Sequence, residues 1–480
     1  MDNTSKLSVV EEFSKVAFGD KRLTNRLVNL AKKLEGSPEA SLPRVTETES
    51  ELEGAYRLLR NDRVSPEQIL APHFEATIAR AKSADRLLAI HDSTVFKFGG
   101  ESRQEEIGRV NQKDQGFLGH FALLTSRTEF SHPLGIIGYE PTFRHGGNRR
   151  EVPKGKKDPQ SESLRWGRLV TEVENRLESN VRPIHIMDSE ADDYYLLSQM
   201  VSDQQSFIVR SRQDRNQCRI LGKAKRNKLS ALCEEFEFFT RREVFLSKRK
   251  SKGPSKRIKS KRGCPRNARK AQLKITAEAI EIPKPKYVPL EGSKLEKLFV
   301  NLVHVYEVKP PKGEIPVDWK LITTEQINTE EEVLNIVDDY RARWLIEEYY
   351  KALKTGCNYE KAQLETKKTL LTMLAIQIPI AWQLLVLRSL SRQSPSAPAE
   401  LIFTKKQIEV LRVFARIRKP LSPRPKAKEI AYAIAGLGGH ITNNGPPGWM
   451  VLSRGLQQFI NNFAVWNTAL EHAKQGCDQS

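Results

Sequence analysis

A stretch of eighteen residues without a charged side chain, LLTMLAIQIPIAWQLLVL at positions 370–387, limits how this 480-residue chain can fold. A run of this length and composition forms either a membrane-spanning helix or a helix that is buried on all sides in a protein core. Here Thr372, Gln377, Pro379 and Gln383 interrupt the apolar residues, and basic residues flank both ends. We therefore expect a buried core helix and no membrane partner.

The chain has an excess of basic residues, which gives it a formal net charge of +20. An excess of this size indicates a polyanionic partner, and with a membrane set aside that partner is nucleic acid. The five cysteines are widely separated and form no C-x-x-C pair, which argues against a disulfide framework and a zinc site. The N-terminal sequence lacks the pattern of a signal peptide, so we expect a cytoplasmic protein, and the length predicts two to four domains.

The first 70 residues have a helical pattern. Asp20 is placed to cap a helix over GDKRLTNRLVNLAKKL. Two stripes run along this helix about 100° apart, an apolar one of Leu23, Leu27, Leu30 and Leu34 and a polar one of Arg22, Arg26, Asn29 and Lys33. The polar stripe fits a surface that faces DNA phosphates, and an ordinary solvated face explains it equally well.

From about residue 85 short strands replace the helices. An apolar strand at 87–94 ends on Asp92, two partner strands are expected at 117–126 and 132–141, and a second apolar strand ends on Asp188. Between about 213 and 325 the composition is β-rich and basic. Within it, residues 248–270 hold twelve Lys or Arg and no acid, which indicates either a phosphate-contacting arm or a flexible solubilising loop.

Helical pattern returns from about residue 328, and the stretch YRARWLIEEYYKALK at 340–354 is its most informative part. On a helical wheel one arc of roughly 80° holds Tyr340, Arg343, Glu347, Lys351 and Lys354. The opposite, buried side holds Leu345, Ile346, Tyr349 and Leu353. A surface face with charge pairs, each worth about 0.2–0.5 kcal/mol, would explain the same spacing.

Asp92, Asp188 and Glu347 together suggest a catalytic set. Three clustered carboxylates repel one another unless cations neutralise them, and hard oxygen ligands suit Mg²⁺, with Mn²⁺ as a substitute. Two such ions about 3.5–4 Å apart can activate an attacking oxygen and stabilise a leaving oxygen at a phosphodiester. On the same helical face as Glu347, basic side chains would hold the substrate phosphates.

The chain resembles a known family at these positions. Tyr340, Arg343, Glu347 and Lys354 fit Y-x₂-R-x₃-E-x₆-K, a signature of the DDE transposases of bacterial insertion sequences. The blocks around the first two acids, AIHDST at 89–94 and DSEADDY at 188–194, are similar to those of the family. Further stretches resemble the transposon-five branch: GDKRLTNRLVN at 19–29, EGAYRLLRN at 53–61, VRSR at 209–212, PPKGEIPVDW at 310–319, KALKTG at 351–356 and AYAIAGLGG at 431–439.

The resemblance implies an α/β fold with an RNase H-like, retroviral-integrase-like catalytic core. It places a helical DNA-binding domain at 1–70, the catalytic domain at 71–375 with the β-rich insertion at 213–325, and a helical dimerisation domain at 376–480. The implied metal-binding and catalytic triad is Asp92, Asp188 and Glu347. The implied DNA contacts are Tyr340, Arg343, Lys351, Lys354, Arg210, Trp319, Arg22, Arg26, Lys33 and Arg57.

Two positions, Trp319 and Ser189, bear on how the chemistry of the family would work in this chain. Trp319 stands where the family places an aromatic ring that stacks on a flipped base during hairpin formation, although a tryptophan at a strand start is more often part of a core. Ser189 replaces the arginine that usually follows the second aspartate, which removes one positive charge beside the expected metal site.

The expected function is cut-and-paste DNA transposition, with cleavage through a hairpin intermediate and joining of the 3′-hydroxyl ends to target DNA. The partners are then the transposon inverted ends, the target DNA and a second copy of the chain, in the nucleoid of a bacterium. A tail stripe of Leu456, Phe459, Ile460, Phe463 and Leu470 could be core or subunit contact. The alternatives are an RNase H-like nuclease and a catalytically silent DNA-binding regulator of transposition.

Overall fold

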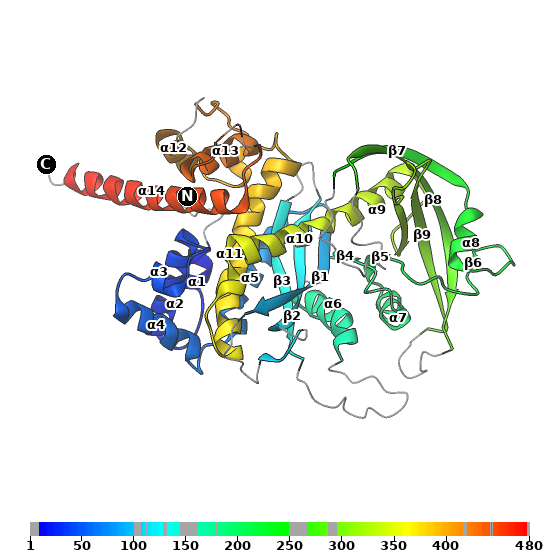
Figure 1. Cartoon of the computed structure of the whole chain (residues 1–480), viewed down its shortest axis with the longest axis horizontal. Coiled ribbons are helices and arrows are strands. Elements are labelled where there is room, and N and C mark those ends of the chain that lie inside the picture. The colour runs from blue at the N-terminus through cyan, green and yellow to red at the C-terminus, as the bar shows by residue number, and fades with distance from the viewer. Residues whose placement is uncertain are drawn as a thin grey trace. The chain divides into compact units, whose positions relative to one another are not determined.

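The chain divides into two compact units in a computed structural model (Figure 1). Unit 1 comprises Met1–Arg149, Thr171–Val181 and Trp344–Ser480, and unit 2 comprises Arg150–Val170 and Arg182–Arg343. The structure describes residues 9–99, 107–110, 114–127, 132–144, 161–177, 181–248, 266–286, 295–415, 420–441, 443 and 445–477.

Unit 1 is mainly helical. Its elements are α1 (Val10–Ser14), α2 (Lys21–Gly36), α3 (Leu42–Val45), α4 (Glu49–Arg60), α5 (Pro66–Ala81), β1 (Leu87–Phe98), β2 (Gln115–Ser126), β3 (His132–Thr142), α10 (Trp344–Lys351), α11 (Lys367–Gln393), α12 (Lys405–Phe414), α13 (Ala427–Leu437) and α14 (Trp449–Cys477). A π-helical turn, Ala352–Gly356, follows α10, and α6 (Arg165–Arg176) begins in unit 2 and ends in unit 1.

Strands β1, β2 and β3 pair antiparallel in the order β3-β2-β1, as the sequence predicts for 117–126 and 132–141. The prediction that the first strand ends on Asp92 is wrong. Asp92 lies within β1, opposite Phe121 of β2, and the pairing continues as far as Phe98 opposite Gln115. The backbone stays extended beyond the acid because β2 is long enough to supply hydrogen-bond partners for it.

Helix α11 contains the uncharged run and forms the centre of unit 1. It is the one helix among the described residues that is long and apolar enough to cross a membrane, and 94% of its apolar window is buried. It contacts helices α2, α4, α5 and α13 and strand β3, and the indole N–H of Trp382 donates to the carbonyl oxygen of Pro133 at 3.1 Å. The predicted core helix is therefore confirmed.

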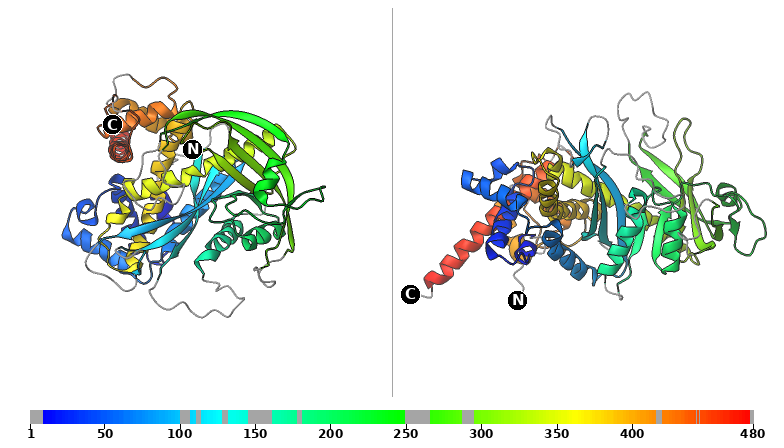
Figure 2. Two further views of the ribbon diagram at one scale, coloured as in Figure 1. Left: turned by 45° about the vertical axis from the view of Figure 1, so that its right-hand side comes forward. Right: turned by 90° about the horizontal axis from the view of Figure 1, so that it is seen from below.

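Helix α14 crosses α13 at very short range. A Cβ atom on Gly455 would lie 1.8 Å from the carbonyl oxygen of Ile434, so only glycine permits this approach. The first turns of α14 are buried, with Leu456 and Phe459 in the core. Its C-terminal half extends beyond the other helices of unit 1 (Figures 1 and 2), and there Val465 and Leu470 are exposed.

Unit 2 combines a sheet with helices on its faces. Its elements are β4 (Ile184–Met187), α7 (Tyr194–Ser202), β5 (Ser206–Arg210), β6 (Arg219–Ile220), α8 (Leu229–Glu234), β7 (Phe238–Leu246), β8 (Arg269–Pro283), β9 (Lys297–Glu307), β10 (Asp318–Thr323) and α9 (Glu330–Ala342). The strand order is β4-β5-β10-β9-β8, and both β6 and β7 pair with β8. Only β4 and β5 are parallel to each other among these pairs, so the sheet is mixed.

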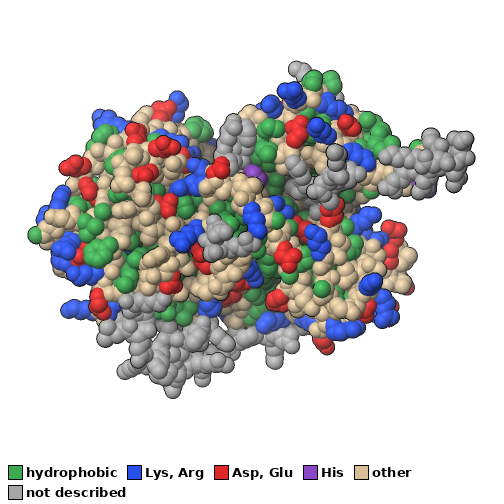
Figure 3. All heavy atoms as spheres, turned by 180° about the vertical axis from the view of Figure 1, so that it is seen from behind, with side chains coloured by type: hydrophobic (Ala, Val, Ile, Leu, Met, Phe, Trp, Pro, Cys, Tyr) green, Lys and Arg blue, Asp and Glu red, His purple; other side chains and the backbone are tan. Residues whose placement is uncertain are grey.

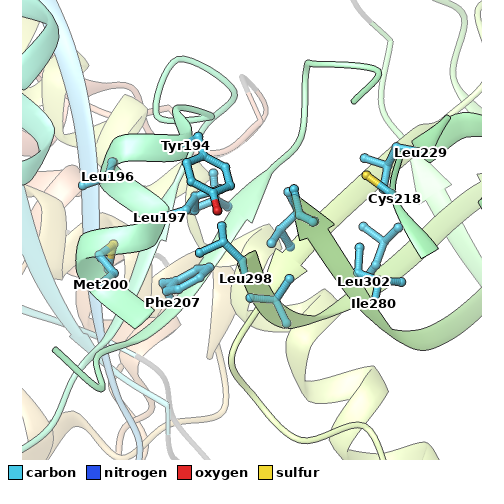
Figure 4. Packing of buried hydrophobic residues seen from close by; sticks show 14 of the residues in the cluster. Tyr194, Leu196, Leu197, Met200, Phe207, Cys218, Leu229, Ile280, Leu298 and Leu302 are labelled. Atoms are coloured by element: carbon cyan, nitrogen blue, oxygen red, sulfur yellow. The ribbon is translucent and has the colours of Figure 1, made fainter. Parts of the chain in front are cut away.

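The core of unit 2 lies between α7, α8 and one face of this sheet. Figure 4 shows Leu197 and Met200 of α7 packed toward Phe207, Leu298 and neighbouring strand residues, all of them buried. This packing positions the loops that follow β4 and β5. The predicted α/β class is confirmed for the chain, and the RNase H-like core remains a prediction.

The segment 340–354 is not a single regular α-helix. Helix α9 ends at Ala342, the N–H of Arg343 bonds to the carbonyl oxygen of Tyr340, α10 begins at Trp344, and the backbone widens into the π-helical turn at Ala352. The expected buried side is confirmed for Leu345, Ile346, Tyr349 and Leu353. The expected common arc is wrong, because it assumed one regular period and because Tyr340 is only 4% exposed.

Candidate nucleic-acid interface and acidic residues

Helix α2 has the two faces that its sequence predicts. The Asp20 carboxylate accepts the N–H of Arg22 at 2.9 Å and caps the helix, and the four stripe leucines are buried. On the other face the Arg22 side chain is 89% exposed, and Arg26 is exposed as well. The Nε of Arg26 lies 3.6 Å from where a Cβ of Gly54 would be, so Arg26 extends over α4.

Two other predicted DNA contacts in this region form ion pairs. The Lys33 ammonium lies 3.0 Å from both Glu47 and Glu51, which joins α2 to the start of α4. Arg57 pairs with Glu53 one turn earlier on α4, at 2.5 Å. Both side chains therefore have a structural partner that a phosphate would have to displace.

Asp92 and Glu347 both belong to unit 1, and helix α10 is attached to strand β1 at Asp92. The hydroxyl of Tyr350 donates to the main-chain carbonyl oxygen of Asp92 at 2.7 Å, and the Asp92 carboxylate accepts the N–H of Ser93 at 2.8 Å. Glu347 precedes Tyr350 by three residues on α10, so the two side chains lie on the same side of the helix. Asp92 and Glu347 are each half-buried.

The two lysines beyond Glu347 are held by protein groups. The Lys354 ammonium donates to the carbonyl oxygen of Val95 at 2.5 Å and lies 3.3 Å from Glu360, and burial lowers its pKa. Lys351 forms a short ion pair with Glu348, which also pairs with Arg388 at 3.3 Å. Lys354 thus joins the end of α10 to β1, a second link beside that of Tyr350.

In unit 2, the acids of the DSEADD segment have different environments. Asp192 is buried and accepts the main-chain N–H groups of Arg212 and Gln213 at 2.7 and 2.8 Å, so it fixes the loop after β5. Asp193 caps α7 through the N–H of Tyr195 at 2.7 Å. Asp188 directly follows β4, as predicted, is half-buried and accepts the N–H of Glu190 at 2.7 Å.

Near Asp188, arginine and aromatic side chains gather around Tyr340. Its ring meets that of Trp319 edge to face, with centroids 5.3 Å apart, and Arg210 donates to the hydroxyl of Ser189 at 3.2 Å. Burial raises the pKa of Tyr340, while the nearby guanidinium groups of Arg210 and Arg343 oppose that rise. Unit 2 thus brings together five of the predicted site residues: Asp188, Arg210, Trp319, Tyr340 and Arg343.

A cavity of about 440 Å³ opens beside Trp319, within the size range of ligand pockets. Four arginines from separate segments line it: Arg210, Arg242, Arg266 and Arg341. Arg242 and Arg341 share Asp338 of α9, at 2.7 and 2.9 Å. Arg266 belongs to the basic tract predicted at 248–270, whereas Arg242 and Arg341 were not predicted from the sequence, because nothing local distinguishes them from other surface arginines.

The predicted metal ligands fall in both units, Asp92 and Glu347 in unit 1 and Asp188 in unit 2. Within either unit, no three described His, Cys, Asp or Glu side chains form a cluster that could hold a metal ion. The donors themselves are oxygen atoms of the kind that Mg²⁺ prefers. Their assembly into one site remains a prediction.

On the face shown in Figure 3, basic side chains are spread over the surface rather than gathered in one patch. Lys and Arg side chains are interspersed there with Asp and Glu side chains. Of the predicted basic tract 248–270, residues 249–265 lie outside the described residues, and Arg269 begins β8.

The exposed basic face of α2, next to its buried leucine stripe, has the features of a DNA-binding helix. Residues 8–64, which contain α1 to α4, match the sequence model of a protein family described as transposase DNA-binding. The match supports a DNA-binding transposase, with DNA as a partner.

Proposed function

We propose that the protein is a cut-and-paste DNA transposase. The match of residues 8–64 to the transposase DNA-binding family supports recognition of DNA by the N-terminal helices. Arg22 and Arg26 on the exposed face of α2 contact the transposon end in this proposal. Lys33 and Arg57 bind DNA as well in this proposal, once a phosphate replaces the glutamates with which they pair.

The observation that carries the catalytic part is the link between α10 and β1. Two contacts, from Tyr350 to Asp92 and from Lys354 to Val95, hold the helix of Glu347 against the strand of Asp92. Asp188, half-buried at the end of β4, completes a set of three carboxylates that would hold Mg²⁺. Bound there, two ions would supply the positive charge that activates the attacking oxygen and neutralises the leaving oxygen.

The chain's own residues position the DNA in this proposal. Arg210 and Arg343, beside Tyr340, bind phosphates next to the scissile bond. The Trp319 ring, which lines the cavity with the four arginines, receives an unpaired base, because closing a hairpin bends the strand end and unstacks a nucleotide. The freed 3′-hydroxyl then attacks the opposite strand, and after the hairpin is reopened it joins to target DNA.

Both transposon ends must be held together for joining, so we propose a homodimer in the end complex. The stripe of α14 is buried at Leu456 and Phe459 and becomes half-buried or exposed toward Leu470. An apolar stripe that continues past its own core provides a contact for a second copy.

A strand-transfer assay tests the proposal, with Mg²⁺ or Mn²⁺ and DNA that carries the inverted ends of the element. Wild type is compared with Glu347→Gln and with Glu348→Gln, a neighbouring carboxylate that pairs with Lys351 and Arg388. We expect metal-dependent hairpin and joined products from wild type and Glu348→Gln, and none from Glu347→Gln. Cleavage without joining would instead indicate a nuclease, and end binding without any product from wild type would indicate a regulator.

A further inference from the structure

The sharpest concentration of positive charge in the described part of unit 2 is a hairpin at its edge, residues 219–228. It begins with strand β6, turns at Gly222, whose φ is +81°, and closes where Cys218 and Asn227 exchange main-chain hydrogen bonds of 3.0 and 2.8 Å. We call this segment, together with Lys297 of β9, the cationic hairpin. Its cations are Arg219, Lys223, Lys225, Arg226, Lys228 and Lys297.

One buried carboxylate organises three of these cations. Glu281 of β8 is 0% exposed and lies directly across from Arg219 in the sheet. Arg219 donates to it at 3.0 and 2.6 Å, Arg226 donates at 2.8 Å, and Lys297 lies 3.7 Å away. Burial alone would raise the pKa of Glu281, but hydrogen bonds from Arg226 and Arg219 more than offset this and hold its pKa below the ordinary value.

Glu281 therefore stays charged and fixes two guanidinium groups whose side chains are still one-third exposed. Arg226 is held further by a hydrogen bond to the carbonyl oxygen of Gln217 at 2.9 Å. A cation fixed in this way loses less conformational freedom on binding an anion than a mobile surface lysine does. The buried carboxylate of Glu281 thus distinguishes this hairpin from a solvated loop whose cations are held by water alone.

The remaining cations are exposed and exceed the nearby acids. Lys223, Lys225 and Lys228 lie on the loop surface, and Lys225 pairs with Glu235 at 2.7 Å. Two carboxylates, Glu281 and Glu235, pair with four of the six cations of the cationic hairpin. The excess is four positive charges against these two acids, and three when Asp214 is counted, whose carboxylate accepts hydrogen bonds from Ser230. An exposed excess of positive charge in so short a segment, with two of its arginines held in place, suits the closely spaced phosphates of a DNA backbone.

We propose that the cationic hairpin binds phosphates of duplex DNA, outside the residues 8–64 that match the DNA-binding family. Such contacts add affinity and orient the duplex but read no sequence. The proposal requires only that the chain binds DNA, and it stands or falls independently of cleavage and joining.

The test measures binding of the full chain to a fluorescent random-sequence duplex, which lacks transposon ends, at several salt concentrations. The variant Lys223→Gln/Lys225→Gln/Lys228→Gln leaves both arginines and Glu281 intact. The matched control, Lys405→Gln/Lys406→Gln/Lys428→Gln, removes the same charge from α12 and α13 in unit 1. Circular dichroism melts show whether both variants fold.

We expect the hairpin variant to reduce the slope of log affinity against log salt by about 0.9 for each phosphate that the variant no longer neutralises. We also expect affinity near 0.1 M salt to fall at least roughly tenfold, with the control close to wild type. An unchanged slope, or an equal change in the control, would overturn the proposal. A loss of binding to poly-glutamate with DNA binding intact would also overturn it, in favour of an acidic protein partner. Failure of strand transfer in wild type bears on the proposed function alone.

Discussion

The hydroxyl of Tyr350 donates a 2.7 Å hydrogen bond to the main-chain carbonyl oxygen of Asp92, and this bond attaches helix α10 to the middle of β1. Glu347 lies three residues earlier on that helix. Two carboxylates separated by 255 positions in the sequence are therefore brought to one region by contacts between side chains and backbone, this one and the bond from Lys354 to the carbonyl oxygen of Val95. The Tyr350 bond is the one that reaches Asp92 itself.

We expect Tyr350→Phe to slow strand transfer by about tenfold to a hundredfold while DNA binding stays unchanged, because small displacements of reacting groups are costly. The free energy of unfolding should fall by about 1 kcal/mol. Tyr349→Phe is the matched control, since it loses a comparable bond from α10 to the carbonyl oxygen of Ile378. Equal rate losses in both variants would mean that the Asp92 contact has only a structural role.

Trp319→Ala should reduce hairpin formation while leaving the first nick in place. Base stacking on an aromatic ring is worth about 1–3 kcal/mol, so the hairpin product should form roughly five- to a hundredfold more slowly. Trp319→Phe keeps a flat ring beside Tyr340 and should restore most of the product. Gel analysis of nicked and hairpin species at early times checks this. A Phe variant as slow as the Ala variant would indicate a role other than stacking.

Stability should depend on pH through Glu35, which accepts hydrogen bonds at the same oxygen from the N–H of Val9 and from Gln383, at 3.2 and 2.9 Å. Burial raises the pKa of Glu35 from 4.5 to about 7, although these hydrogen bonds oppose the rise. The pKa of Glu35 is higher in the folded state than in the unfolded state. Its contribution to the free energy of unfolding is therefore complete below about pH 4.5. It is lost as the pH rises through 7.

The corresponding loss is on the order of 3 kcal/mol. Glu35→Gln should abolish this dependence, so its free energy of unfolding should change less than that of wild type between pH 5 and pH 8.5. Urea titrations at both pH values measure it, with exposed Glu67→Gln as the control. If wild type and Glu35→Gln lose equal stability over this interval, Glu35 is not the titrating group.

Leu470→Asp should weaken self-association of the end complex at least roughly tenfold, because a charge in an apolar contact loses its hydration. Leu470 is 36% exposed on the stripe of α14 that Leu456 and Phe459 begin in the core. Thr468→Asp places the same charge on the same exposed part of the helix but off the stripe. Analytical ultracentrifugation of the end-DNA complexes measures the dimer fraction of each variant, and only Leu470→Asp should lower it. A dimer that persists with Leu470→Asp would place the subunit contact elsewhere.

Local sequence was sufficient to predict the features that depend on periodicity and capping. The leucine stripe of α2, its Asp20 cap and the buried helix α11 were all confirmed, since burial of one face or of a whole helix is recorded in the spacing of apolar residues. The structure also confirms that a strand leads to Asp92 and another to Asp188. The predicted end of the first strand was not confirmed, because the length of β1 depends on how far β2 continues beside it.

Only the tertiary structure decided which charges have partners and which side chains meet. It assigned Lys33 to two glutamates, Lys354 to the carbonyl of Val95 and Asp192 to the loop after β5. It also brought four arginines from four segments to one cavity beside Trp319. The sequence by itself determined the helices, the strands and which carboxylate, basic and aromatic side chains a site could use. Contacts between distant residues were left to topology and register, because no local pattern encodes the distance between two segments of a folded chain.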